Sequence, residues 1–367
     1  MSMSRKILFL TKYAELGASS RHRAYQFLPL LHEANILFDI KPLFPDDYLS
    51  NLYTGARAAY GKLVRELVAV RALASRWWLI LHSLSDYDVI YLEYEALPYL
   101  PFAVEKQLFT SARCVVVDYD DAIYANYEYH RNPFVRWLLG TKIREIVKQS
   151  AFVIVANNHL AQWTLRLNPN VHVIPTCVDL RHYPLRSTRF TQNDRPVIGW
   201  IGTPITAKHL RILEKPLKAL RRRYDFTLKV IGAPGFTLDG VDVRAIAWNA
   251  GSEYEELHGC DIGVMPLPDD PWTRGKSAFK LIQYLAAGVV GVASPVGANC
   301  EVIQDGQNGM LAQSERDWLE KLSLLIESPF QRKQLAQAGR RTVELGYSLQ
   351  ANAPRWLEVL RRALDQN

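Results

Sequence analysis

Residues 261–297, DIGVMPLPDDPWTRGKSAFKLIQYLAAGVVGVASPVG, decide the fold of this chain. The apolar run at 262–267 indicates a buried strand, and a polar loop with Pro271 and Gly275 follows it. A helix is expected over 277–287, stopped by Gly288, with a second short strand after it. A strand, a glycine-bearing loop and a helix start, in that order, form an anion site, because the exposed amides and the helix dipole attract negative charge.

Lys276 and Lys280 add positive charge to this helix start. Together with the amides they predict a phosphate-binding site. The alternative is a pair of solvated lysines on an ordinary amphipathic helix, since a basic helix start is by itself a weak motif.

Length and composition favour a two-domain cytoplasmic enzyme. The chain has 367 residues, 49% of them hydrophobic and 22% charged, which exceeds one typical core and excludes disorder. The four cysteines lie far apart without C-x-x-C spacing, so neither a disulfide framework nor a zinc site is expected. No apolar run approaches the roughly 20 residues of a membrane span, and the run at 7–10 is too short for a signal peptide.

The net charge of +7 is spread evenly over the chain. Residues 1–185 hold 20 Lys and Arg against 17 Asp and Glu, and the remainder holds 24 against 20. Nucleic-acid-binding proteins concentrate positive charge on one face or arm, so we expect no nucleic-acid partner.

Strand and helix patterns alternate through both halves of the chain, which predicts an α/β fold with parallel sheets and right-handed crossovers. The expected strands lie at 6–10, 38–44, 88–94, 114–121, 152–157, 171–176, 196–202, 226–232 and 241–248, and within the segment quoted above. Long helices are expected at 52–84, 133–149 and 210–224, with terminal helices at 315–326, 329–345 and 350–364. The polar stretch 180–196 places a domain boundary near residue 185.

Residues 261–297 resemble the donor-binding block of glycosyltransferase family 4, E-G-F-G-x-x-x-x-E-A-M-A-x-G-x-P-V-V-A-S. Three further blocks resemble family motifs in the family's order: VIPTCVDLRHY (173–183), IGTPITAKHL (201–210) and DGQNGMLA (305–312). The resemblance implies a GT-B architecture, in which two Rossmann-like domains with parallel sheets face a central cleft. Residues 1–185 would then bind the acceptor, residues 186–345 would bind a nucleotide-sugar donor, and the helix 346–367 would pack back towards the N-terminal domain.

The implied activity is transfer of a sugar from a nucleotide-diphosphate sugar to an acceptor hydroxyl, with retention, in the synthesis of cell-surface polysaccharide or glycolipid. No metal and no cofactor are expected, because the enzymes that this chain resembles use cationic side chains and helix dipoles instead. The residues predicted to bind the donor are Gly202, Thr203, Lys208, Gly275, Lys276, Ser277, Lys280 and Gln283.

The chain departs from the family pattern at both motif glutamates, which fall on Gly275 and Gln283. Gln283 is still able to hydrogen-bond a ribose hydroxyl, because its amide both donates and accepts, whereas Gly275 offers only its backbone. In the IGTPITAKHL block, Thr203 replaces the family's arginine.

Asp118, Asp120 and Asp121 gather at the end of the strand expected at 114–121, where the family usually has a histidine. Repulsion among them raises a pKa towards the range of proton transfer, so they are the predicted catalytic residues. The alternative is that one aspartate caps the next helix and the others are solvated.

The loop GASSRHR, residues 17–23, joins the first strand to the first helix. Gly17, Ser19, Ser20 and Arg21 are predicted to bind an anionic acceptor or the donor phosphates. The loop lacks G-x-G-x-x-G, which argues against a dinucleotide dehydrogenase.

Residues 56–82 combine basic side chains, including Arg76, with Trp77 and Trp78. A basic amphipathic helix of this kind suits an anionic membrane surface, and a peripheral position at the inner face of the membrane would favour a lipid-linked or glycan acceptor. The alternative is a core-packed helix with an ordinary basic face.

Two rival functions fit the same architecture. A nucleotide-sugar epimerase would act on one substrate without an acceptor, and a non-catalytic GT-B partner subunit would have lost the chemistry together with the glutamates.

Overall fold

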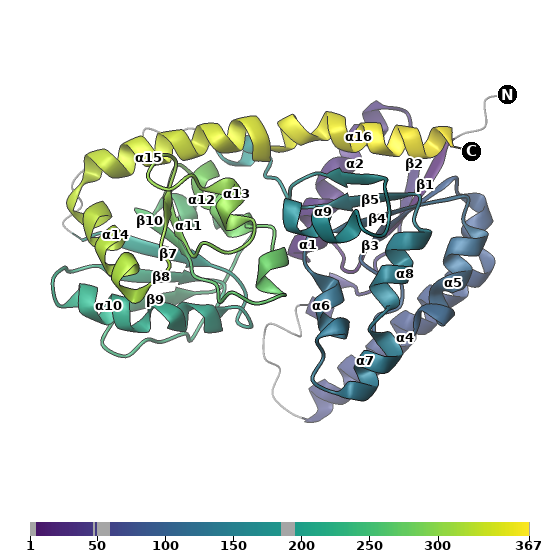
Figure 1. Cartoon of the computed structure of the whole chain (residues 1–367), viewed down its shortest axis with the longest axis horizontal. Coiled ribbons are helices and arrows are strands. Elements are labelled where there is room, and N and C mark those ends of the chain that lie inside the picture. Colours follow the sequence, from purple (N-terminus) through teal and green to yellow (C-terminus); the bar gives the residue numbers. More distant parts are fainter. Residues whose placement is uncertain (1–4, 47, 50–58, 185–194, 367) are drawn as a thin grey trace. The chain divides into compact units, whose positions relative to one another are not determined.

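The computed structural model describes residues 5–46, 48–49, 59–184 and 195–366 (Figure 1). The chain forms two compact units: unit 1 comprises Met1–Thr176 and Asn352–Asn367, and unit 2 comprises Cys177–Ala351. The boundary predicted near residue 185 lies outside the described residues. Within the part of the chain that is described, no helix has both the length and the apolar character that a bilayer crossing needs.

Unit 1 contains a parallel six-stranded sheet in the order β2-β1-β3-β4-β5-β6. Its strands are β1 Lys6–Leu10, β2 Leu37–Ile40, β3 Val89–Glu93, β4 Cys114–Tyr119, β5 Phe152–Val155 and β6 Val171–Val173. The inner strands β3, β4 and β5 are buried along their whole length. Their continuous apolar runs are typical of a parallel sheet covered by helices on both faces.

The helices of unit 1 are α1 Ala18–Arg23, α2 Leu28–Glu33, α4 Ala59–His82, α5 Phe102–Ser111, α6 Ile123–Glu128, α7 Pro133–Leu139, α8 Lys142–Gln149 and α9 Asn158–Thr164. The single helix expected over 133–149 is therefore two helices, separated at Gly140, a residue with low helix propensity. Of the helix expected over 52–84, residues 52–58 lie outside the described residues.

Arg76 on α4, one of the basic side chains of the segment 56–82, does not lie on the surface of the helix. Its side chain is only 4% exposed, and one guanidinium nitrogen donates to the carbonyls of Thr11 (3.1 Å) and Lys41 (2.7 Å). Arg76 therefore ties α4 to the loops that follow β1 and β2, and it is not a surface cation.

Helix α16, Leu349–Asp365, brings an aromatic side chain into unit 1. Trp356 is 1% exposed and stacks on Phe27, with ring centroids 4.7 Å apart, and on Phe9, at 6.1 Å. The last part of the chain thus completes the core around the first strand.

Unit 2 repeats the α/β arrangement, with a parallel sheet in the order β12-β11-β10-β7-β8-β9. The strands are β7 Val197–Ile201, β8 Thr227–Ile231, β9 Val243–Ile246, β10 Ile262–Met265, β11 Val290–Ala293 and β12 Met310–Leu311. The helices are α10 Glu214–Arg221, α11 Glu253–His258, α12 Phe279–Ala286, α13 Asn299–Val302, α14 Glu315–Glu327 and α15 Pro329–Thr342.

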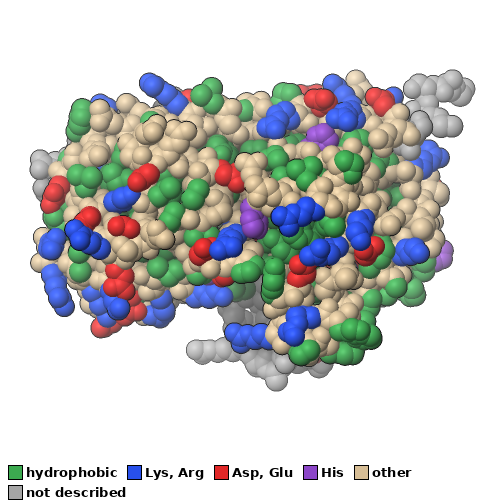
Figure 2. Space-filling view, viewed as in Figure 1, with side chains coloured by type: hydrophobic (Ala, Val, Ile, Leu, Met, Phe, Trp, Pro, Cys, Tyr) green, Lys and Arg blue, Asp and Glu red, His purple; other side chains and the backbone are tan. Residues whose placement is uncertain are grey.

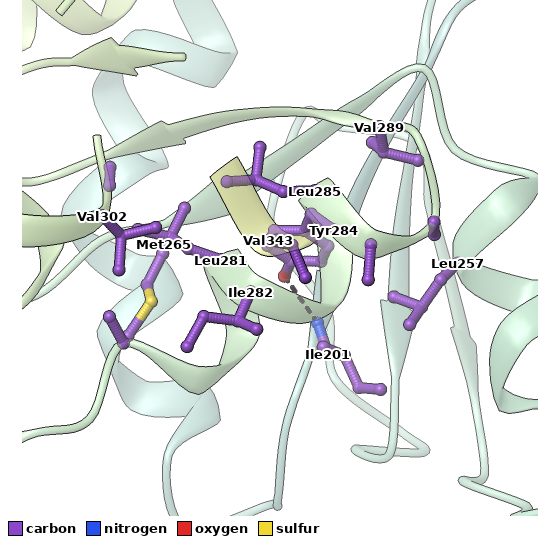
Figure 3. Close-up of a cluster of buried hydrophobic side chains, with 14 of the residues drawn as sticks. Ile201, Leu257, Met265, Leu281, Ile282, Tyr284, Leu285, Val289, Val302 and Val343 are labelled. Carbon is purple, nitrogen blue, oxygen red and sulfur yellow. Dashed lines mark hydrogen bonds between the residues drawn. The ribbon is translucent and has the colours of Figure 1, made fainter. Parts of the chain in front are cut away.

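Alternate residues of these strands point into two different cores, as the pleat of a sheet requires. Trp200 packs in the core beneath α10 and α14, whereas its neighbour Ile201 packs against α12. Figure 3 shows the second core, in which the Ile201 amide donates to the Tyr284 hydroxyl at 3.0 Å. A Cβ atom on Gly263 would lie 2.4 Å from the ring of Tyr284, so this glycine lets α12 approach the sheet closely.

Candidate functional site

In unit 2, the predicted donor residues begin where β7 ends, at Gly202. Its amide donates to the carbonyl of Ile231 (3.0 Å), which holds the turn at the carboxyl edge of the sheet. A Cβ atom on Gly202 would meet the ring of Trp200 at 2.6 Å and the Cε atom of Lys280 at 2.9 Å. The stem of Lys280 therefore lies against this turn, at the edge where open α/β sheets bind ligands.

Three of the predicted lysines gather near His209. The pKa of His209 is lowered first by burial and then by the charges of Lys208, Lys276 and Lys280. These side chains come from the turn after β7, the loop after β10 and the first turn of α12. Lys208, Lys276 and Lys280, which we call the lysine cluster, thus all act on the charge of His209, with Asp270 acting in the opposite sense, and the combined charge of the three lysines favours an anion.

Aromatic rings fix two members of the lysine cluster. Lys280 Nζ lies 5.6 Å from the ring centroid of Trp200, and Lys276 Nζ lies 5.4 Å from that of Trp272. Cation–π contacts of this kind stabilise a lysine without neutralising it. Neither tryptophan was among the predicted site residues.

The loop between β10 and α12 is held by its own hydrogen bonds. Thr273 is buried, and its hydroxyl donates to the carbonyl of Pro268 at 2.6 Å. Ala278 has φ +54°, in the left-handed region, and α12 begins after it at Phe279. The helix therefore starts two residues later than position 277. Gly275 is buried and Ser277 is half-buried in the loop before it.

The turn from Thr203 leads into a 3-10 helix, Ala207–Leu213, where the sequence predicted an α-helix from 210. Thr206 closes this turn: its hydroxyl accepts from the Thr203 amide at 3.1 Å and donates to the Thr203 carbonyl at 3.0 Å. Lys208 follows in the first turn and is exposed. It is therefore accessible to a ligand.

Gln283 is buried, with 4% exposure, and is engaged by a carboxylate that the sequence did not reveal. Its Nε2 donates to Glu253 Oε1 at 2.8 Å. The same carboxylate accepts from Trp248 Nε1 (2.6 Å) and from the Tyr183 hydroxyl (3.0 Å). Glu253 thus orients the Gln283 amide by accepting from its nitrogen.

In unit 1, Asp118 is part of a buried ion pair. It is 1% exposed, and Arg23 NH2 donates to its Oδ1 at 2.6 Å, while Tyr91 donates to its Oδ2. Burial alone would lower the pKa of Arg23, but the Asp118 carboxylate outweighs it and raises that pKa. Arg23 also donates to the carbonyl of Ile174 (2.7 Å), so the Arg23–Asp118 pair joins α1 to β3, to β4 and to the residue that follows β6.

Asp120 differs from Asp118 in having no cation within hydrogen-bonding distance in the described residues. The Tyr94 hydroxyl donates to its Oδ1. Burial, and then the charge of Asp121, raise the pKa of Asp120 to about 7. Tyr94 has φ +63°, a left-handed conformation that is strained for an aromatic residue, and such strain clusters at functional sites.

The loop 17–23, predicted to bind an anionic acceptor or the donor phosphates, contacts a buried carboxylate through Ser20. The Ser20 hydroxyl donates to Glu93 Oε2 at 2.6 Å. The same Oε2 accepts from the amide of Lys12 at 2.9 Å. At Gly17 a Cβ atom would lie 2.3 Å from Tyr13 Cβ, so the glycine is required for packing.

Arg21 is the half-buried cation of the same loop. Its NH1 lies 3.5 Å from the carbonyl of Glu15, and its Nε lies 3.4 Å from His22 Nε2. Anion binding by this loop stays a prediction, and Arg21 is the residue on which it rests.

Comparison with known proteins supports the expected resemblance. Residues 195–328 match the family model described as Glycosyl transferases group 1. This match covers the lysine cluster and Gln283, while the narrower assignment to family 4 stays a prediction. None of the curated proteins compared with the chain matches it.

Solved structures that resemble this chain are GT-B glycosyltransferases. Sucrose-phosphate synthase from Thermosynechococcus elongatus has 15% identity and a TM-score of 0.70, over 99% of this chain and 100% of that one. A glycosyltransferase from Rickettsia africae has 14% identity and a TM-score of 0.65, over 100% of both chains. The Anabaena protein HepE, solved with UDP-glucose, has 15% identity and a TM-score of 0.65, over 97% of this chain and 99% of that one. The fold is therefore the α/β fold of GT-B proteins.

Proposed function

We propose that this protein transfers a sugar from a nucleotide-diphosphate sugar to an acceptor hydroxyl, and that UDP-sugars are the first donors to test. The observation that carries the proposal is the lysine cluster beside Gly202, within the segment that matches Glycosyl transferases group 1. The leaving diphosphate gains negative charge as the glycosidic bond breaks, and fixed cations stabilise that charge most strongly in the transition state.

Each donor residue has a defined part in this proposal. Lys208 and Lys280 act as point charges on the diphosphate, and the absence of a side chain at Gly202 lets a phosphate approach the backbone. Gln283 accepts a hydrogen bond from a ribose hydroxyl through its amide oxygen, because Glu253 fixes the other end of the amide. No metal takes part in this scheme.

For the acceptor we favour Asp120 over Asp118. A carboxylate with a pKa of about 7 is suited to take a proton from an acceptor hydroxyl near neutral pH, whereas Asp118 is committed to Arg23. Retention of the anomeric configuration follows from the family resemblance. A cytoplasmic location is proposed from the composition, and a glycan or lipid-linked acceptor in surface polysaccharide or glycolipid synthesis is proposed from the basic segment 56–82.

The test is nucleotide-sugar binding and turnover by the full chain. We expect UDP- or GDP-sugars to raise the melting temperature and to be hydrolysed slowly without an acceptor. Lys208→Ala should weaken nucleotide binding about tenfold or more, since it removes a charge-assisted contact. Lys215 is the matched control, an exposed lysine of the same unit that pairs with Glu315 at 3.0 Å, and Lys215→Ala should bind normally.

A non-catalytic partner subunit is the second candidate, and Gly275 favours it. The position holds no carboxylate to meet the transferred sugar, and it is buried. This candidate predicts nucleotide binding without turnover, and copurification with an active relative. Conversion of one nucleotide sugar into an epimeric nucleotide sugar, with no acceptor present and no release of nucleotide, would instead indicate an epimerase. Absence of both binding and hydrolysis for every nucleotide sugar would contradict the transferase proposal.

A further inference from the structure

Helix α7 of unit 1 turns an apolar face to solvent. Phe134 is 62% exposed, Trp137 is 77% exposed and Leu138 is 39% exposed. Residues at positions i, i+3 and i+4 share one side of a helix, so these three form a single surface. Leu139 is the one α7 residue that is buried. The helix therefore packs on unit 1 through a small contact and presents its larger side chains outward.

This apolar face is ordered by its own contacts. The rings of Phe134 and Trp137 lie 5.7 Å apart, and Asn132 caps the helix by accepting from the Phe134 amide at 2.9 Å. Among the tryptophans that the structure describes, Trp137 is the most exposed. A contiguous exposed patch with two aromatic rings marks a contact surface rather than ordinary surface composition.

Within residues 129–141, which include α7, the charged side chains are all basic. Residues 129–141 contain Arg131 and Arg136 and neither aspartate nor glutamate. Both arginines are exposed, and Arg136 NH1 donates to the carbonyl of His130 at 2.6 Å, which holds its guanidinium at the start of the helix. Figure 2 shows basic and hydrophobic side chains together over α7.

We propose that α7 is a membrane-contacting helix that docks unit 1 on an anionic phospholipid surface. Phe134 and Trp137 enter the boundary between headgroups and acyl chains, where tryptophan is favoured, and Arg131 and Arg136 meet lipid phosphates. The inference rests on exposed side chains and charge and is independent of the proposed sugar transfer.

Charge and ring chemistry together favour a bilayer over a protein partner. A groove on a protein partner would bury the aromatic face but would need a carboxylate opposite each arginine. An anionic bilayer has an apolar acyl-chain region and headgroup phosphates over its whole surface. Helix α4, where the sequence placed this contact, has exposed Trp77 and Trp78, but its Arg76 is buried. Leu67, Val70 and Leu81 of α4 are exposed as well, so α4 is tested beside α7 in the same experiment.

The experiment is cosedimentation of the full chain with vesicles. One set is phosphatidylcholine alone, and the other contains about one third phosphatidylglycerol. We expect binding to the anionic vesicles at low salt, weakened as salt screens the charges. The double variant Phe134→Ser with Trp137→Ser should lower the partition coefficient about tenfold or more, because it removes the apolar anchor. Arg131→Gln should weaken binding to anionic vesicles only.

Two control variants make the result specific to α7. Phe330→Ser changes a phenylalanine of unit 2 with similar exposure, 69%, and should leave vesicle binding unchanged. Trp77→Ser with Trp78→Ser tests α4 in the same way. Because all these side chains are exposed, unchanged melting temperatures should show that the variants fold.

Three results of the vesicle experiment would overturn the proposal. They are a wild-type chain that ignores anionic vesicles at low salt, an α7 variant that binds as well as wild type, and loss of binding in the α4 variant alone. A change of oligomeric state in the α7 variant, seen by light scattering, would assign the face to a second copy of the chain and would equally overturn it.

Discussion

Replacing Asp118 by asparagine separates a catalytic role from a structural one. The substitution keeps the shape of the side chain but removes its charge, so the Arg23 guanidinium, 2% exposed, is left buried without a counter-ion. Breaking a buried ion pair by neutralising one partner costs about 3–5 kcal/mol. The loss is expected in the free energy of unfolding, because Asp118 also accepts from Tyr91 and anchors β4 to α1.

The assay is urea unfolding of Asp118→Asn, followed by nucleotide-sugar hydrolysis under conditions in which the variant is folded. An apolar double variant, Arg23→Met with Asp118→Leu, should recover much of the lost stability, because no charge is then left unpaired. Glu145→Gln is the surface control, since its pair with Lys148 is solvent-exposed and should contribute at most about 1 kcal/mol. If Asp118→Asn unfolds like wild type but has lost hydrolysis, Asp118 is catalytic and our structural assignment is wrong.

Three further predictions concern single side chains. Because burial raises the pKa of Asp120 to about 7, the folded chain binds this proton more tightly than the unfolded chain, so the free energy of unfolding should fall as pH rises from about 4 to 7. Asp120→Asn should flatten that slope in urea unfolding, and an unchanged slope would refute the assignment. Gln283→Glu restores the family residue but places a second carboxylate beside Glu253, so the free energy of unfolding should fall by about 1–3 kcal/mol in thermal unfolding. A higher free energy of unfolding would contradict this prediction. Gly263→Ala should lower the free energy of unfolding by about 1–3 kcal/mol, because the new methyl group displaces the Tyr284 ring. A variant as stable as wild type would show that the ring moves without loss of stability.

The sequence predicted those parts of the site that depend on local order. Lys276 and Lys280 are close along the chain, and the pattern of strand, loop and helix places both at one sheet edge. Lys208 could be assigned to the same sheet edge, because the strands of a parallel sheet end at a common edge. In the structure, all three lysines act on the charge of His209. The fold followed for the same reason, since alternating strands and helices leave few ways to form a parallel sheet.

Partners that lie far apart along the chain were not predictable in this way. Asp118 finds Arg23 across 95 positions, and Gln283 finds Glu253 across 30. Each pairing depends on how distant segments pack in the folded chain, and no local sequence pattern predicts that packing. Three aspartates at one strand end therefore looked alike, although packing gives Asp118 a cation and gives Asp120 a tyrosine.

Trp356 makes the first unit of the chain the last to be finished. The strands of unit 1 are synthesised early. Trp356, whose ring stacks on Phe9 and Phe27, is synthesised only about 180 residues after Thr176. At usual synthesis rates this is a delay of roughly 10 to 40 s. During that interval the nascent unit carries an uncovered aromatic surface, of the kind that chaperones bind, while unit 2 is already able to fold. A chain that stops short of α16 would keep that surface uncovered permanently.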